Sequence, residues 1–173
     1  MNFFKSSILA ALVLAGSVSA AVIDFEHPDA YGIPGGTNYD NNPVNTQGFS
    51  FSNNTYVVDV TTGVNSGEGP AYSGSFVGLN DRGGAIEMTA TDGSLFALQN
   101  FWIHGFFGDS DGSVMGYLNG VLVGTVGLST GADWQNIVAN FTQVDRIVID
   151  AAGNFMVDDI DASISASDVP EPA

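Results

Sequence analysis

The segment VMGYLNGVLVGTV, residues 114–126, decides the fold class of this 173-residue chain. Asn119 and Gly120 stand between two runs of mainly apolar residues. Both residue types tolerate the positive φ that a two-residue type I′ turn requires. The segment therefore predicts a β-hairpin with strands at 114–118 and 121–126.

Short strands of the same kind extend on both sides of this hairpin. Gly, Asn, Asp, Ser and Thr interrupt the sequence every few residues, and β-branched and aromatic residues fill the gaps, which is typical of an all-β sandwich or barrel. In the first strand, Ile23 and Phe25 should share one face and Asp24 and Glu26 the other. The remaining expected strands are 22–26, 48–51, 55–60, 76–79, 85–90, 96–106, 134–141, 145–150 and 155–160, with long loops at 27–47 and 62–75.

The composition is strongly acidic and contains no cysteine. Nineteen Asp and Glu stand against three Lys and Arg, a formal net charge of −16. Such a polyanion should repel nucleic acid and anionic lipid, and it attracts divalent cations. Without disulfides the stability must come from a hydrophobic core, and the length suits one domain.

The first 20 residues have the pattern of a secretory signal peptide. Lys5 gives a positive start, residues 8–15 are apolar, and residues 16–20 are mostly small. The apolar run is shorter than the roughly 20 residues that a bilayer span needs. Cleavage is expected before Ala21. The expected organisation is a signal peptide at 1–20, a β-sandwich domain at 21–162 and a flexible tail at 163–173.

The chain ends in Val169-Pro170-Glu171-Pro172-Ala173. This segment resembles the start of the PEP-CTERM sorting signal of Gram-negative bacteria, in which an apolar helix and several Arg follow and the membrane protease exosortase is the processing partner. The sequence ends at Ala173, before those parts of the signal. The resemblance implies a secreted protein of the cell surface or extracellular matrix. Because exosortase systems usually accompany exopolysaccharide genes, it also implies a task in a biofilm matrix.

The order of the strand motifs resembles a group of PEP-CTERM proteins with a jelly-roll, galactose-binding-like domain of the carbohydrate-binding type. The resemblance implies an antiparallel β-sandwich of two sheets, in which the first and last strands lie side by side near a structural calcium ion. The matching motifs are Asp24-Phe25-Glu26, Gly48 to Phe51, Gly116-Tyr117-Leu118-Asn119-Gly120, Trp134 to Ile137, Ile147 to Asp150, and Val157 to Ile160.

Acidic residues of the first and last strands form the candidate metal site. If the two strands pair, their carboxylates face one another, and like charges placed opposite destabilise a sheet unless a cation offsets them. Carboxylate oxygens are the ligands that Ca²⁺ prefers. The alternative is a solvated strand face. The candidate calcium ligands are Asp24, Glu26, Asp158, Asp159 and Asp161.

A second acidic segment is Asp109-Ser110-Asp111-Gly112. It begins like a calcium loop, but Val114 stands where an EF-hand has Gly, and no Glu closes the loop. A plain turn is the interpretation that the residues favour.

Aromatic side chains in polar loops are the candidates for saccharide binding. A pyranose offers apolar CH faces and a belt of hydroxyls, which suit a flat ring flanked by amides and carboxylates. Trp102 and Trp134 lie in apolar strands, where core packing is expected. Packing within turns is the alternative for the loop residues. The candidate ligand-binding residues are Tyr31, Tyr39, Asp40, Asn42 and Tyr72.

No catalytic motif is found in the sequence. The two His, His27 and His104, lack metal-ligand spacing, and there is no Gly-x-Ser-x-Gly elbow. His104 is expected to be a partly buried strand residue with one hydrogen bond.

The sequence as a whole predicts a secreted, non-catalytic protein that contacts exopolysaccharide and carries a structural calcium ion. A polysaccharide hydrolase or lyase is one alternative, and a self-associating structural subunit is another. An open sheet face with aligned aromatics would favour binding, facing carboxylates in a cleft would favour an enzyme, and long uncharged strand edges would favour self-association.

Overall fold

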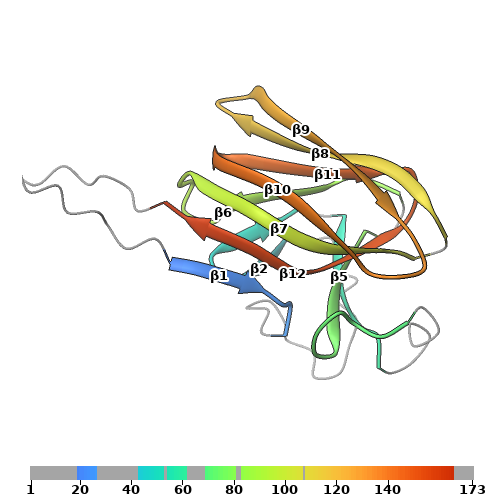
Figure 1. Cartoon of the computed structure of the whole chain (residues 1–173). Helices are drawn as coiled ribbons and strands as arrows, with labels where there is room; N and C mark the ends of the chain where they lie inside the picture. The colour runs from blue at the N-terminus through green and yellow to red at the C-terminus, as the bar shows by residue number, and fades with distance from the viewer. Residues whose placement is uncertain are drawn as a thin grey trace, which may run out of the picture.

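The computed structural model describes residues 19–26, 43–52, 54–61, 69–80, 83–106 and 108–165, with the backbone alone at residues 19 and 20. Within these residues the chain forms β-strands and no helix (Figure 1). No helix long and apolar enough to span a membrane is found in this part of the chain. The strands are β1 (Ser19–Ile23), β2 (Val44–Thr46), β3 (Phe49–Phe51), β4 (Thr55–Asp59), β5 (Phe76–Asn80), β6 (Ile86–Ala90), β7 (Phe96–Gly105), β8 (Ser110–Leu118), β9 (Val121–Thr130), β10 (Gln135–Val144), β11 (Arg146–Ala151) and β12 (Phe155–Ile164).

The strands form two antiparallel sheets. Sheet A has the order β10-β7-β12-β5-β4, with β1 also paired to β12, and sheet B has the order β2-β3-β6-β11-β8-β9. The expected all-β sandwich of two antiparallel sheets is therefore confirmed. The first and last strands lie side by side as predicted, with Ile23 opposite Ile160.

The main core fills the space between the two sheets. Phe96, Leu98 and Phe101 of β7 point into it and are fully buried. Side chains of a strand alternate between its two faces, and this alternation shifts by one residue between Leu98 and Phe101, where the pairing with β12 is also irregular. Aromatic pairs reinforce the contact, as where the rings of Phe49 and Phe96 meet edge to face at 5.4 Å. The chain has no cysteine, so burial of these side chains, and not disulfide bonds, stabilises the fold.

The hairpin at the centre of the sequence has the predicted turn, and its strands are longer than predicted. Asn119 and Gly120 have φ of 52° and 77°. β8 begins at Ser110, so the interpretation of residues 109–112 as a plain turn is wrong. Gly112 pairs with Ala151, and a Cβ at Gly112 would collide with the backbone of β11. This close approach explains a glycine inside a strand.

The ends of three predicted segments also differ in the structure. β2 lies inside the predicted loop 27–47, because a turn at Gln47 and Gly48 pairs it with β3. β1 ends at Ile23, and the positive φ of Phe25 turns the chain while its ring stays buried. β12 reaches Ile164 and pairs with Ser19, so residues 163 and 164 belong to the sandwich and not to the tail. Residues 27–42, 62–68 and 166–173 lie outside the described residues.

A smaller apolar cluster lies on the outer face of sheet A. Val58, Val77 and Met156 alternate along their strands with residues of the main core, so they point away from it. Ala71 and Trp134 pack over this cluster. The outer face of sheet A is therefore covered at one end, and the segment around Ala71 is fixed beside the exposed remainder of that face.

Candidate functional site

Three aromatic rings gather on the outer face of sheet A, and we call Tyr72, Trp102 and Trp134 the aromatic platform. Tyr72 stacks on Trp102 with ring centroids 3.8 Å apart and planes 16° apart. Trp134 meets Tyr72 edge to face at 6.1 Å. Tyr72 remains 41% exposed. The platform therefore offers a flat aromatic surface to solvent.

The expectation that both tryptophans pack in the core is wrong for Trp102 and is met in part by Trp134. Phe101 and Ile103 on β7 point into the core, so Trp102 between them points outward. Trp134 directly precedes β10 and packs over the smaller cluster. Both tryptophans are half-buried.

A row of polar side chains crosses three strands next to the platform. Asn136 on β10 stands opposite Trp102 in the sheet register and donates from Nδ2 to Asn100 Oδ1 at 3.0 Å. Asn100 Nδ2 in turn donates to Asp161 Oδ2 on β12 at 3.3 Å. Each amide is oriented by its neighbour. This arrangement fixes a line of hydrogen-bonding groups at the edge of the aromatic surface.

The segment that carries Tyr72 is held down on both sides of the ring. Trp134 Nε1 donates to Pro70 O at 3.0 Å. Ser73 N donates to Asp158 Oδ2 at 3.0 Å, and Ser73 Oγ donates to Asp159 Oδ1 at 2.7 Å. Tyr72 is thus positioned before any ligand arrives, which lowers the entropy that binding must cost.

Glu26 holds the end of the same segment. Its Oε1 accepts hydrogen bonds from the backbone N–H of Ser75 at 2.6 Å and Phe76 at 2.7 Å. Gly74, at a φ of +60°, leaves room for this carboxylate, because a Cβ there would collide with it. Asp24 Oδ1 accepts from Glu26 N at 3.1 Å and steadies the turn after β1.

The predicted calcium ligands therefore make contacts in different places and do not form one cluster. Asp158, Asp159 and Glu26 contact one segment, residues 73–76, while Asp161 contacts Asn100 on β7. Among the described residues, no three Asp, Glu or His come together in a group able to hold a metal ion. Calcium binding by this chain stays a prediction.

Asp158 is a fully buried carboxylate. It stands opposite Trp102 in the sheet register and accepts hydrogen bonds from Ser73 N and Asp159 N. Burial raises its pKa from 3.8 to about 7, against the effect of these two donors. Asp158 is therefore half protonated near neutral pH.

Asp158 is expected to make the fold less stable as the pH rises from 4 to 7. Because its pKa is about 7 in the folded protein and near 3.8 in the unfolded chain, the folded state keeps a proton that the unfolded state has lost. Its stabilising effect is complete below pH 3.8 and is lost as the pH passes about 7. The difference in unfolding free energy between Asp158→Asn and the parent protein should rise by about 2–3 kcal/mol from about pH 5 to about pH 8.

Urea unfolding at both pH values in the presence of a chelator measures this difference. The matched control is Asp150→Asn, which neutralises an exposed carboxylate on β11. An unfolding free energy whose pH dependence is the same in Asp158→Asn and in the parent protein would show that Asp158 ionises normally.

His104 lies beneath the platform and fits its predicted role. It is 8% exposed, and its Nε2 lies 2.8 Å from Ala132 O. Its ring meets Trp134 at 5.3 Å. It is thus a packed strand residue with one hydrogen bond, and it supports Trp134 from below.

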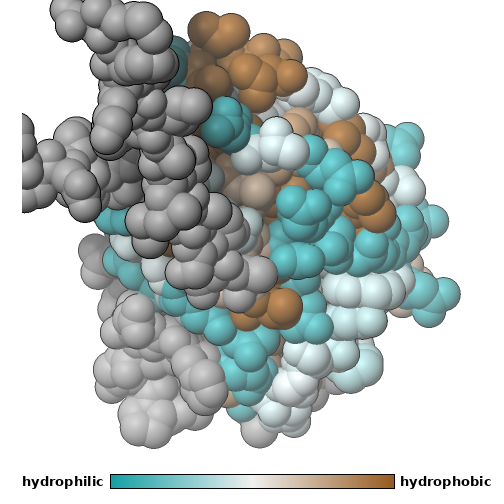
Figure 2. All heavy atoms as spheres, turned by 60° about the vertical axis from the view of Figure 1, so that its left-hand side comes forward, coloured by the Kyte–Doolittle hydropathy of each residue, from teal (hydrophilic) through white to brown (hydrophobic). Residues whose placement is uncertain are grey.

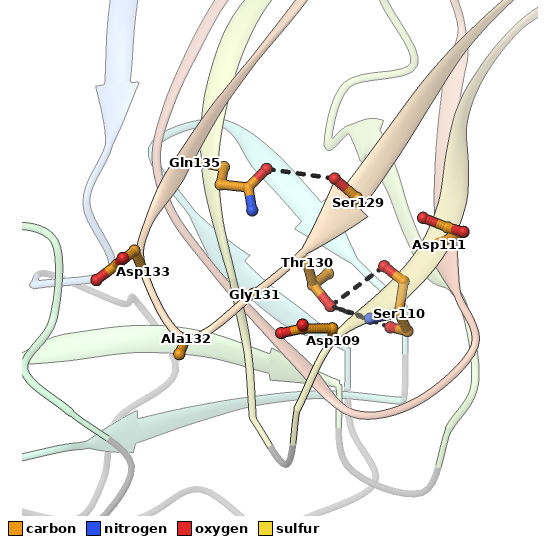
Figure 3. Close-up of a pocket in the computed structure, with 9 residues that line it drawn as sticks. All are labelled: Asp109, Ser110, Asp111, Ser129, Thr130, Gly131, Ala132, Asp133 and Gln135. Carbon is orange, nitrogen blue, oxygen red and sulfur yellow. Dashed lines mark hydrogen bonds between the residues drawn. The ribbon is translucent and has the colours of Figure 1, made fainter.

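A polar groove with a volume of about 540 Å³ lies at the end of the sandwich, where β8 begins and β9 ends (Figure 3). Thr130 forms its floor through hydrogen bonds with the backbone N–H and the hydroxyl of Ser110, both at 3.0 Å. Figure 3 shows Asp111 and Asp133 at opposite ends of the groove. The carboxylates are spread along it and do not form a facing pair.

Of the five candidate ligand-binding residues, the structure places Tyr72 at the exposed platform. Tyr31, Tyr39, Asp40 and Asn42 lie outside the described residues. Sequence reasoning missed Trp102, Trp134, Asn100 and Asn136. Strict alternation from Phe96 and Leu98 would place Trp102 in the core, because it takes no account of the one-residue shift between Leu98 and Phe101.

Comparison with known proteins identifies similar folds and no family. No protein-family model and no curated protein matches the chain. Among solved structures, a family 61 carbohydrate-binding module in complex with β-1,4-galactotriose is 19% identical, covers 67% of this chain and 88% of its own, and has a TM-score of 0.38. The C-terminal family 22 carbohydrate-binding module of Clostridium thermocellum Xyn10B is 14% identical, covers 70% and 88%, and has a TM-score of 0.45. A family 16 carbohydrate-binding module is 18% identical, covers 63% and 84%, and has a TM-score of 0.36.

Proposed function

We propose that this protein binds a neutral polysaccharide, without catalysing its cleavage, through the aromatic platform and the polar row on the outer face of sheet A. The observation that carries the proposal is the stack of Tyr72 on Trp102, open to solvent and bordered by Asn136 and Asn100. A sugar ring can lay its CH face on the aromatic surface, while its hydroxyls reach the amides and Asp161.

The charge of the protein favours a neutral ligand. The chain carries a formal net charge of −16, and Asp161 belongs to the polar row itself. An anionic polysaccharide would meet repulsion both at long range and at the site. We therefore expect that the protein does not bind uronate-rich polysaccharides.

The support for a binding role over a catalytic one comes from the state of the nearby acids. A glycosidase needs two accessible carboxyl groups about 5–10 Å apart. Asp158 is buried and accepts backbone hydrogen bonds, and Asp161 accepts from Asn100. His104 is also buried, with its Nε2 against Ala132 O. Asp158 and His104 therefore do not face a substrate, and Asp161 stands as a single carboxylate in the polar row.

Tryptophan fluorescence tests the proposal directly, because both tryptophans of the chain belong to the platform. A glycan array selects the polymer, and titration with oligosaccharides of that polymer should change the emission and saturate. Bound glycan with unchanged tryptophan emission would place the site elsewhere. Reducing ends or unsaturated products that accumulate with time would refute the non-catalytic role.

The proposed setting is the cell surface or biofilm matrix of a Gram-negative bacterium. The signal-like residues 1–20 and the segment Val169–Ala173 support export and exosortase processing. We also propose that calcium stabilises the domain by joining carboxylates of the turn after β1 to carboxylates of β12, the strand with which β1 pairs.

Calcium is expected to raise the thermal stability of the protein. An ion that binds only the folded state adds about 2.7 kcal/mol at a hundredfold excess over its dissociation constant. Asp159→Ala should reduce this gain, and Asp111→Ala in the polar groove should leave it unchanged. Differential scanning calorimetry with calcium and with chelator measures both effects. If Asp111→Ala alone abolishes the gain, the calcium ion binds in the polar groove and not at β1 and β12. If the melting temperature is the same with calcium and with chelator, the protein has no stabilising calcium site.

A further inference from the structure

We infer that β9 is a self-association edge, at which two copies of this protein pair antiparallel through their β9 strands and form a two-fold dimer. β9 is the last strand of sheet B, and in the described part of the chain β8 alone pairs with it (Figure 1). Its outward N–H and C=O groups are therefore available to another strand.

β9 lacks the features that usually protect an edge strand. Its ten residues include no charged residue and no proline. Its register with β8 shifts once, beside Val123, and then runs without interruption from Gly124 to Thr130. The exposed side chains in this regular part are those of Thr125 and Ser129, with Gly127 between them. Such small residues allow a second backbone to approach closely.

The other edges of the sandwich are protected. β2 has three residues, β1 has five, and β4 has five and ends in Asp59. β10 is as long as β9, but two register shifts and the positive φ of Asn140 interrupt its pairing with β7. Bulges and short edges of this kind prevent pairing between molecules. The regular part of β9 therefore stands out among the edges.

The distribution of charge favours a second copy as the occupant. Two chains of net charge −16 repel each other over most of their surfaces. Residues 112–132, which include all of β9, carry no charge. Two copies can meet along β9 without bringing carboxylates together, so the neutral stretch of one copy is matched by that of the other.

Apolar side chains at the start of β9 add to the interface. Val121 is 64% exposed, and Leu122 and Val123 are each 50% exposed. Figure 2 shows an apolar group of atoms at the top of the molecule, where the β8–β9 hairpin ends. Exposed neighbours of this kind mark contact surfaces.

The symmetry of the pairing limits the assembly to a dimer. Antiparallel pairing of identical strands uses the same surface on both copies and closes after two. Because the remaining edges are protected, the residues that the structure describes offer the dimer no second regular edge through which a filament could grow. The seven regular residues span about 24 Å, enough for a short ladder of hydrogen bonds.

Sedimentation equilibrium of the purified protein over a range of concentrations tests the inference. We expect a monomer–dimer equilibrium that strengthens with salt, because the Debye length falls from about 10 Å at 0.1 M to about 3 Å at 1 M and screens the net charges. Leu122→Glu and Thr125→Glu should each raise the dissociation constant at least tenfold, because each copy then adds a carboxylate to a contact that is neutral in the parent protein. Both side chains are exposed in the monomer, so its circular dichroism should be unchanged.

Thr142→Glu is the matched control, since it adds the same charge at an exposed position of β10. It should leave the dissociation constant within twofold of the parent value. A monomer up to roughly 1 mM would overturn the inference. So would a dimer that both β9 variants leave intact, or one that Thr142→Glu disrupts as strongly. Oligomers larger than a dimer would show that the assembly does not stop at two copies.

Discussion

Trp102→Ala is expected to weaken saccharide binding at least tenfold while the protein stays folded. Trp102 forms the lower layer of the stack with Tyr72, and central aromatic residues of a binding surface commonly contribute 2 kcal/mol or more. The cost in stability should stay near 1–2 kcal/mol, since Trp102 is half-buried and lies outside the main core. Isothermal titration with an array-selected oligosaccharide measures the affinity, and urea unfolding measures the stability.

Tyr117→Ala is the control for this variant. Tyr117 is also a half-buried aromatic residue, on sheet B, where the Arg146 guanidinium lies 4.3 Å from its ring centroid. Its removal should cost similar stability and leave the affinity unchanged. Equal affinity losses in the two variants, or none in Trp102→Ala, would show that the platform does not hold the ligand.

Phe101→Ala should have the opposite effect, although Phe101 is the immediate neighbour of Trp102. Phe101 is fully buried in the core between the sheets, and truncation of such a ring to alanine costs about 3–5 kcal/mol in unfolding free energy. This is a large part of the roughly 5–15 kcal/mol that a typical domain has. The affinity of the folded protein for saccharide should change less than twofold. Urea unfolding and titration at low temperature measure the two quantities.

If Phe101→Ala does not fold, Phe101→Leu gives a smaller cost of about 1–2 kcal/mol and keeps the comparison. A Phe101 variant that loses affinity with little loss of stability would mean that the faces of β7 are assigned the wrong way round.

The sequence predicted most strands because local signals decide them. Asn119-Gly120 fixes a hairpin by its backbone preferences alone, and the alternation in residues 86–90 follows from one buried face. β2 was missed because its three residues are held by pairing with β3 and not by a pattern of their own. The extension of β12 to Ile164 likewise depends on its pairing with β1 and β7.

The candidate site was harder to predict, for two physical reasons. β7 is apolar on both faces around Phe101 and Trp102, because the smaller apolar cluster covers the outer face of sheet A beside it. The alternation of apolar and polar residues that identifies a half-buried strand is therefore weak there. The contacts that hold Tyr72 join residues far apart in the chain, such as Ser73 and Asp158, which are 85 residues apart. Spacing within a strand carries no information about such contacts. Tyr72 was found because an aromatic residue in a Gly/Ser-rich loop is itself a local signal.

The most direct test follows the two indole N–H resonances by NMR while a binding oligosaccharide is added. Ligand seated on the stack of Tyr72 and Trp102 should shift the Trp102 indole signal and the side-chain amides of Asn100 and Asn136, and leave the backbone signals of β9 in place. Shifts confined to Asp109, Asp111 and Asp133 in the polar groove, with both indole signals unmoved, would contradict the account.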